Sequence, residues 1–175
     1  EGLQEIRAAG ARIVALTDAT HWHAKHRLSS LGLTAHFDWL VARPDVAIPD
    51  HTLLEKVSVL GSAPDAPAAF CGMRPGMRKP DPNILWDACA SMGVEVGQVA
   101  MVGDNLEKDI AMAQSAGVLD IWAGYGTPTR EDLAVVISVS DWSSAALATT
   151  VRETEQLRVV PTHTVWSFSE IVGLL

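Results

Sequence analysis

The chain has 175 residues, of which 48% are hydrophobic, enough for one domain with a substantial core. Its 13 basic and 21 acidic residues give a formal net charge of -8, which argues against a general surface for nucleic acid or anionic membranes. No apolar run approaches the roughly 20 residues of a spanning helix, and Cys71 and Cys89 lack the spacing of metal ligands or a disulfide framework. We therefore expect a cytoplasmic protein without a nucleic-acid or membrane partner, and the sequence leaves its oligomeric state open.

The first half of the chain alternates between helical and strand patterns. Apolar residues recur at helical spacing over residues 3–9, and the apolar run 13–16 predicts a buried strand. A second helix is predicted over 21–33 and a short strand over 39–41. Prolines then interrupt residues 44–80, where the pattern predicts an irregular insertion with one helix over 50–60.

The second half returns to regular alternation. The patterns predict helices over 82–92 and 107–116 and buried strands over 99–102 and 118–123. The tail predicts further helical segments at 130–137, 145–157 and 168–175. Strands that alternate with helices through short loops predict an α/β fold of three layers, in which helices cover both faces of a parallel sheet.

Polar residues gather where the predicted strands end. Thr17 and Asp18 follow the strand at 13–16, Asp104 follows the strand at 99–102, and Lys79 precedes the helix before that strand. Open parallel sheets bind ligands outside the carboxyl ends of their strands. We therefore expect these side chains to form one site.

The chemistry of these side chains is that of a phosphate site with a divalent metal. A hydroxyl and backbone amides at Thr17 and Asp18 are suited to a phosphate oxygen, and Lys79 is suited to neutralising its charge. Mg²⁺ takes one or two carboxylates together with water and substrate phosphate. Asp104 and Asp109, five residues apart across a turn that enters a helix, are the predicted metal carboxylates. One of them can be a direct ligand, while the other also binds the metal or orients a water or the lysine.

Three segments resemble motifs of the haloacid dehalogenase-like (HAD) hydrolases. Residues 13–18 (IVALTD) resemble the second motif, 79–82 (KPDP) the third, and 103–109 (GDNLEKD) the fourth, and they occur in the family's order. The loop 124–126 (GYG) and the segment 167–171 also resemble the family. The resemblance implies a Rossmann-like HAD core over residues 1–175, with the segment 44–80 as an irregular insertion between the second and third motifs.

The resemblance also implies a mechanism. Members form an aspartyl-phosphate on the first Asp of an Asp-x-Asp pair, whose second Asp acts as general acid and base. This sequence contains no Asp-x-Asp pair. We therefore expect the first motif, and the central strand that carries it, to lie upstream in a longer protein. The resemblance then carries over two catalytic residues, Thr17 for the phosphate and Lys79 for charge neutralisation, and two metal residues, Asp104 for Mg²⁺ and Asp109 for support of the metal's surroundings.

The implied activity is hydrolysis of a small phosphorylated metabolite. Dehalogenases share the scaffold but do not need metal carboxylates, so Asp104 and Asp109 favour phosphoryl chemistry. A receiver-like domain would place its lysine after its acidic pair, whereas Lys79 comes before Asp104. The main alternative is a non-catalytic pseudoenzyme that binds phosphate or metal without turnover.

Other residues have simpler interpretations. His21, His23 and His26 suggest a transition-metal site, but the sequence offers no carboxylate or cysteine at a spacing that completes one, so a solvated face or a position near the site entrance is favoured. Trp86 and Trp122 are predicted to be core residues. Read alone, Asp104 and Asp109 are compatible with an ordinary helix cap and a solvated acid in the first turn.

Overall fold

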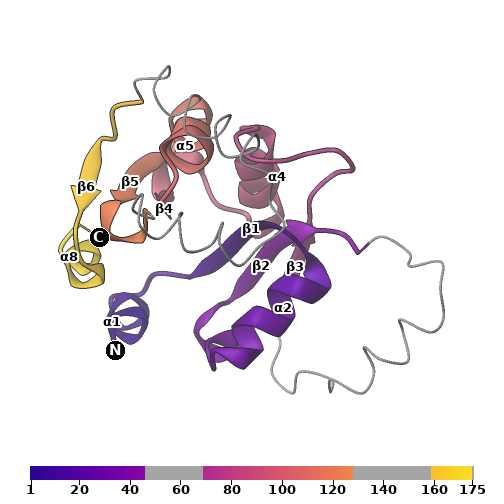
Figure 1. The fold of residues 1–175 in the computed structure, drawn as a ribbon, viewed down its shortest axis with the longest axis horizontal. Coiled ribbons are helices and arrows are strands. Elements are labelled where there is room, and N and C mark those ends of the chain that lie inside the picture. Colours follow the sequence, from indigo (N-terminus) through magenta and orange to yellow (C-terminus); the bar gives the residue numbers. More distant parts are fainter. Residues whose placement is uncertain (46–68, 128–158, 175) are drawn as a thin grey trace, which may run out of the picture. The chain divides into compact units, whose positions relative to one another are not determined.

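The computed structural model describes residues 1–45, 69–127 and 159–174 (Figure 1). These residues form two compact units, Glu1–Arg78 and Lys79–Leu174. Each unit contains a parallel three-stranded sheet, in the orders β1-β2-β3 and β4-β5-β6. The α/β class with parallel strands is therefore confirmed.

The first unit contains α1 (Gly2–Ala8), β1 (Val14–Thr20), α2 (His21–Ser30), β2 (Trp39–Arg43) and β3 (Ala69–Gly72). Both helices and the strands β1 and β2 were predicted. Strand β3 was not predicted, because it has only four residues and lies among prolines and glycines, which interrupt any strand pattern. It nevertheless pairs with β2 in register from Trp39 with Ala69 to Ala42 with Gly72.

The core of the first unit lies on its middle strand. Leu40 and Val41 are 1% exposed and Ala42 is fully buried, as expected for a parallel strand covered on its faces. Ala24 of α2 belongs to the same cluster as Leu40 and Ala42, and Leu28 packs against it. Helix α2 therefore covers one face of this sheet.

Strand β1 extends further than the sequence predicted. It was expected to end at Leu16, but it continues to Thr20 with an irregularity in its pairing. Leu16 pairs with Val41, and the next pair is Thr20 with Arg43, so β1 contains more residues than β2 over this stretch. Thr17 and Asp18 consequently lie within a bulge of the strand, where the backbone leaves the regular ladder.

The second unit has three strands and three α-helices in its described part. The strands are β4 (Ala100–Gly103), β5 (Leu119–Ala123) and β6 (His163–Val165), and the helices are α4 (Asn83–Met92), α5 (Ala111–Ala116) and α8 (Phe168–Val172). The single helix predicted over 107–116 is a π-helical turn, η3 (Leu106–Ile110), that leads into α5. Strand β6 has only three residues and was not predicted. The helices expected over 50–60, 130–137 and 145–157 lie outside the described residues.

Buried aliphatic residues hold the second unit together. Ile110, Met112 and Ile121 are fully buried, and Val165 and Ile171 are nearly so. In this unit η3 and α5 contact β5, β6 pairs with β5, and α8 contacts β6. None of the helices in the described part of the chain is long and apolar enough to span a membrane.

Trp86 is not the core residue that was predicted. It is 44% exposed, although its indole Nε1 donates to the carbonyl oxygen of Ala116 at 3.1 Å. An indole N–H requires an acceptor, and here the acceptor is at the C-terminus of α5, which leaves the ring at the surface. Trp122 is half-buried on β5.

A buried carboxylate fastens the short strand β6. Asp120 of β5 is 2% exposed and accepts hydrogen bonds from the amide (2.7 Å) and hydroxyl (2.6 Å) of Thr162. Gln114 donates to the same carboxylate at 3.3 Å. Because a buried carboxylate requires such donors, Asp120 and Thr162 fix the point at which β6 begins.

A second carboxylate fixes the entry to β1. Asp38 accepts hydrogen bonds from the guanidinium of Arg7 and from the amide of Ile13, each at 2.8 Å. Burial alone would raise the pKa of Asp38, but the Ile13 amide and Arg7 outweigh burial and hold the pKa below its ordinary value.

We expect Asp38→Asn to destabilise the protein at pH 7 by about 1–2 kcal/mol, because a charged acceptor is lost from two hydrogen bonds. The folded-state pKa of Asp38 is lowered, so its contribution is complete above the unfolded pKa of about 3.9 and disappears as the pH falls through the folded pKa. Denaturation at several pH values should therefore show the difference from wild type shrinking below about pH 4. Glu5→Gln, on the exposed face of α1, is the control, and a difference that does not change with pH would contradict this role.

Candidate active site

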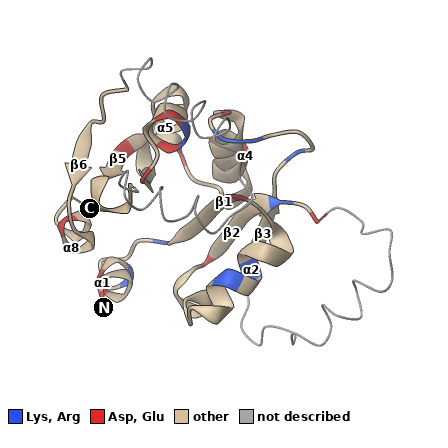
Figure 2. Ribbon diagram, viewed as in Figure 1, with Lys and Arg blue, Asp and Glu red and all other residues tan. Residues whose placement is uncertain are grey.

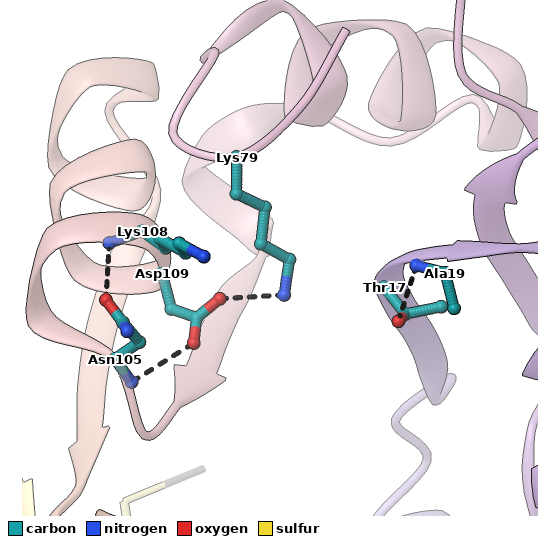
Figure 3. A network of polar contacts seen from close by, with 6 residues as sticks. All are labelled: Thr17, Ala19, Lys79, Asn105, Lys108 and Asp109. Atoms are coloured by element: carbon teal, nitrogen blue, oxygen red, sulfur yellow. Dashed lines mark hydrogen bonds and ion pairs between the residues drawn. The ribbon is translucent and has the colours of Figure 1, made fainter. Parts of the chain in front are cut away.

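A buried ion pair in the second unit joins Lys79 to Asp109 (Figure 3). Lys79 Nζ lies 2.7 Å from Asp109 Oδ1, and the two side chains are only 13% and 6% exposed. The other carboxylate oxygen, Oδ2, accepts the amide of Asn105 at 3.2 Å. The carboxylate is thus held from two sides, and the lysine is brought to the carboxyl end of β4.

The turn after β4 is shaped by Asn105. Its side-chain oxygen accepts the amide of Lys108 at 2.9 Å, and its carbonyl oxygen accepts the amide of Asp109 at 2.8 Å. This is the N-cap interaction that begins η3. Figure 2 shows acidic and basic positions side by side in the segment that leads into α5. The cap determines where Asp109 points.

Gly103 leaves room for Asp109. A Cβ atom at this position would lie 2.3 Å from Asp109 Cβ and 2.6 Å from its Oδ2. Such contacts are far shorter than any that folded proteins accommodate, so a larger residue at position 103 would displace the carboxylate. The packing therefore explains why glycine and the second aspartate occur together in the segment 103–109.

Asp104 is placed differently from Asp109, because its side chain is exposed while its backbone is tied down. Its carbonyl oxygen accepts Trp122 Nε1 at 3.0 Å and Thr127 Oγ1 at 2.9 Å. Nearby, burial raises the pKa of Tyr125, and the negative charge of Asp104 raises it further. Tyr125 is therefore a neutral phenol at physiological pH.

Asp104 and Asp109 are better suited to an open magnesium site than to a metal site enclosed by protein ligands. Among residues 1–45, 69–127 and 159–174, no three His, Cys, Asp or Glu side chains gather in a group that is able to hold a metal. Mg²⁺ does not need such a cage, because it keeps several waters and binds through one or two carboxylates plus substrate phosphate. Asp104 provides an exposed carboxylate, whereas both oxygens of Asp109 are already engaged by Lys79 and Asn105.

Thr17 and Asp18 belong to the first unit. Thr17 Oγ1 accepts the amide of Ala19 at 3.1 Å (Figure 3), and the carbonyl oxygen of Asp18 accepts Arg43 Nε. Both contacts stabilise the bulge at the end of β1. Lys79 and Asp109 are thus in contact within the second unit, while the assembly of all five residues into one site stays a prediction.

The histidines of α2 have partners other than a metal. His23 Nδ1 lies 2.8 Å from Thr20 Oγ1, and the rings of His26 and Trp22 are stacked with centroids 5.4 Å apart. His21 lies 3.6 Å from a carboxylate oxygen of Asp45.

Three residues that fix the backbone at the start of α2 and at Asp104 were not identified from the sequence. Asp45 accepts the backbone amide of Trp22 at 2.8 Å at the start of α2, and Trp122 and Thr127 hold the backbone of Asp104. Each acts across a long separation in the chain, which local periodicity does not reveal. The one sequence feature that pointed to such a contact was the tryptophan at position 122, which lies next to the Gly-Tyr-Gly loop.

A family model of haloacid dehalogenase-like hydrolases matches residues 1–117, more than half of the chain. The chain therefore belongs to this family. The match includes the segments around Thr17, Lys79 and Asp104, and it confirms the resemblance drawn from them.

Curated relatives with phosphatase names match over part of their length. The chain is 26% identical to the phosphoserine phosphatase of Thermus thermophilus over 147 residues. The matched region covers 83% of this chain and 47% of that protein. It is 29% identical over 112 residues to an acid sugar phosphatase of Staphylococcus aureus, covering 63% of this chain and 42% of that protein. The chain thus spans about half the length, or less, of these relatives.

A solved structure supports the fold. The HAD phosphatase from Thermococcus onnurineus matches 99% of this chain and 54% of its own, with a TM-score of 0.57 and 19% sequence identity. At this level of identity the match establishes the HAD fold and no specific chemistry.

We expect Asp109→Asn to lower the free energy of unfolding by about 3–5 kcal/mol, because it removes the carboxylate charge that lies 2.7 Å from the buried ammonium of Lys79. The double variant Lys79→Met/Asp109→Leu should recover part of that loss, since it removes both charges. Urea denaturation measures both effects, with Lys108→Met as a control on an exposed lysine of the same turn. A loss below about 1 kcal/mol for Asp109→Asn would show that the pair contributes little to folding.

Proposed function

We propose that this protein is a Mg²⁺-dependent phosphohydrolase that acts on a small phosphorylated metabolite through an aspartyl-phosphate. The observation that carries the proposal is the buried Lys79–Asp109 pair, which fixes a cation at the turn after β4, the same turn that carries the exposed Asp104. A fixed cation and a carboxylate at this edge of a parallel sheet suit a phosphate and its metal. Membership of the HAD-like hydrolases and the phosphatase names of the relatives support the same activity.

The three residues of the second unit have distinct proposed roles. Lys79 neutralises charge on the transferring phosphoryl group, and Asp109 holds the lysine in place through its Oδ1. Asp104 holds Mg²⁺, with Asp109 as support for the metal's surroundings. When bound, Mg²⁺ would neutralise charge on the phosphoryl oxygens and help to orient the substrate.

Thr17 and Asp18 are proposed to hold the phosphate. The Thr17 hydroxyl already accepts the amide of Ala19, so its own hydrogen remains available to a phosphate oxygen. The carboxylate of Asp18 would repel an anion, and its contribution is therefore its backbone amide. The bond from Arg43 to the Asp18 carbonyl fixes that backbone.

The nucleophile must come from outside residues 1–175 in this proposal, because the sequence contains no Asp-x-Asp pair. A carboxylate oxygen would attack phosphorus, and the P–O bond to the substrate alcohol would break as a second aspartic acid protonates the leaving oxygen. Water, deprotonated by the same aspartate, would then attack phosphorus and release phosphate and the original carboxylate.

The setting proposed for this reaction is the cytoplasm. Cys71 and Cys89 do not form a disulfide, and Cys89 is buried, as is usual for proteins kept under reducing conditions. The strongly acidic composition implies that the phosphorylated substrate is met by locally placed cations such as Lys79 rather than by a generally basic surface.

We expect Asp104→Ala, made in the full-length protein, to reduce Mg²⁺-dependent hydrolysis of p-nitrophenyl phosphate by about 100-fold or more, because the proposed metal ligand is lost. Lys108→Ala, which changes an exposed charge in the same turn, is the matched control and should retain wild-type turnover. If Asp104→Ala keeps most of the activity, Asp104 is not part of the site. Full-length wild-type protein that is folded but inactive on phosphomonoesters would favour the pseudoenzyme.

A further inference from the structure

We propose that Trp122 and Thr127 are positioning residues for Asp104, an inference that rests on the proposed role of Asp104 as the Mg²⁺ ligand. Both residues donate hydrogen bonds to the Asp104 carbonyl oxygen, Trp122 through Nε1 at 3.0 Å and Thr127 through Oγ1 at 2.9 Å. A carbonyl oxygen has two lone pairs, so these two donors satisfy it completely. The peptide plane that follows Asp104 is thereby fixed.

The orientation of this peptide governs the carboxylate because the Asp104 side chain is exposed. An exposed side chain has few neighbours to restrict it, so the direction of its Cα–Cβ bond depends on the backbone. Metal ligands need to be held to within about half an ångström of the productive geometry. In this turn the backbone bonds from Trp122 and Thr127 provide that restraint.

The register of the sheet explains how Trp122 reaches Asp104. Gly103, which precedes Asp104, is paired with Trp122 across β4 and β5. The chain then turns through residues 124–126 and returns to Asp104, where a Cβ on Gly126 would lie 2.9 Å from the Asp104 Cβ. Glycine at position 126 therefore allows the loop to approach closely enough for the Thr127 hydroxyl to reach the carbonyl.

Trp166, the residue that follows β6, contacts Trp122. The two indole rings meet edge to face with centroids 5.6 Å apart. Trp166 also lies against Gly124, where a Cβ would come within 2.7 Å of the ring. The chain segments that follow β4, β5 and β6 are thus joined around Asp104, although Trp166 itself is 64% exposed.

Trp122→Phe and Thr127→Val test the inference, because each removes one donor while keeping a side chain of similar shape. Trp86→Phe is the matched control, since it deletes the same kind of bond, from an indole N–H to the Ala116 carbonyl at 3.1 Å, away from Asp104. Thr127→Ser keeps the hydroxyl and serves as the rescue variant. Mg²⁺ affinity is measured calorimetrically in the full-length protein, together with amide hydrogen exchange over residues 103–110 without metal.

We expect Trp122→Phe and Thr127→Val each to weaken Mg²⁺ binding by about 10-fold or more, as for other groups that support a metal ligand. Both should also speed amide exchange over 103–110, whereas Trp86→Phe and Thr127→Ser remain within about twofold of wild type on both measures. Wild-type affinity in the first two variants, or equal weakening in Trp86→Phe, would overturn the inference.

The proposed Mg²⁺ role of Asp104 and the proposed positioning role of Trp122 and Thr127 are refuted by different results. If the wild-type protein does not bind Mg²⁺, or if Asp104→Ala binds it normally, the proposed metal role is refuted, and the positioning role toward the metal is refuted with it. If Asp104→Ala abolishes binding while Trp122→Phe and Thr127→Val leave it unchanged, the metal site stands and the positioning role alone is refuted.

Discussion

The contact on which the site depends is the buried ion pair between Lys79 and Asp109. Two charges removed from water are stable only when each compensates the other, so the pair fixes the approach of the Lys79 segment to the turn after β4. Its geometry also imposes requirements on the sequence. Gly103 must lack a side chain to make room for the Asp109 carboxylate, and Asn105 must cap η3 so that this carboxylate faces the lysine.

The turn after β4 places the carboxylates of Asp104 and Asp109 in different environments, although the sequence alone does not distinguish them. Asp109 is buried and fully engaged by Lys79 and Asn105, whereas Asp104 presents an exposed side chain on a backbone held by Trp122 and Thr127. The first arrangement suits a residue that orients a cation, and the second suits a residue that binds one. This division of roles supports phosphoryl chemistry, in which a fixed cation and a metal share the charge of the phosphate.

Local sequence predicted the parts of the fold that depend on local patterns. The apolar run before Gly103, the helix over α4 and the motifs around Thr17, Lys79 and Asp104 were recognisable because short segments encode them. Strands β3 and β6 were not recognisable, since four and three residues give no periodicity and their stability comes from pairing with β2 and β5. The bulge in β1 and the bonds to the Asp104 carbonyl likewise depend on residues distant in the chain.

The most direct test of the central claim is to trap the covalent intermediate in the full-length protein. The protein is mixed with a ³²P-labelled phosphomonoester and Mg²⁺ and quenched in acid within one turnover. We predict protein-bound label that hydroxylamine releases, as expected for an acyl phosphate, on an aspartate that is not among residues 1–175. Hydrolysis without any trapped label, or label on a residue of this chain, would contradict the proposed mechanism.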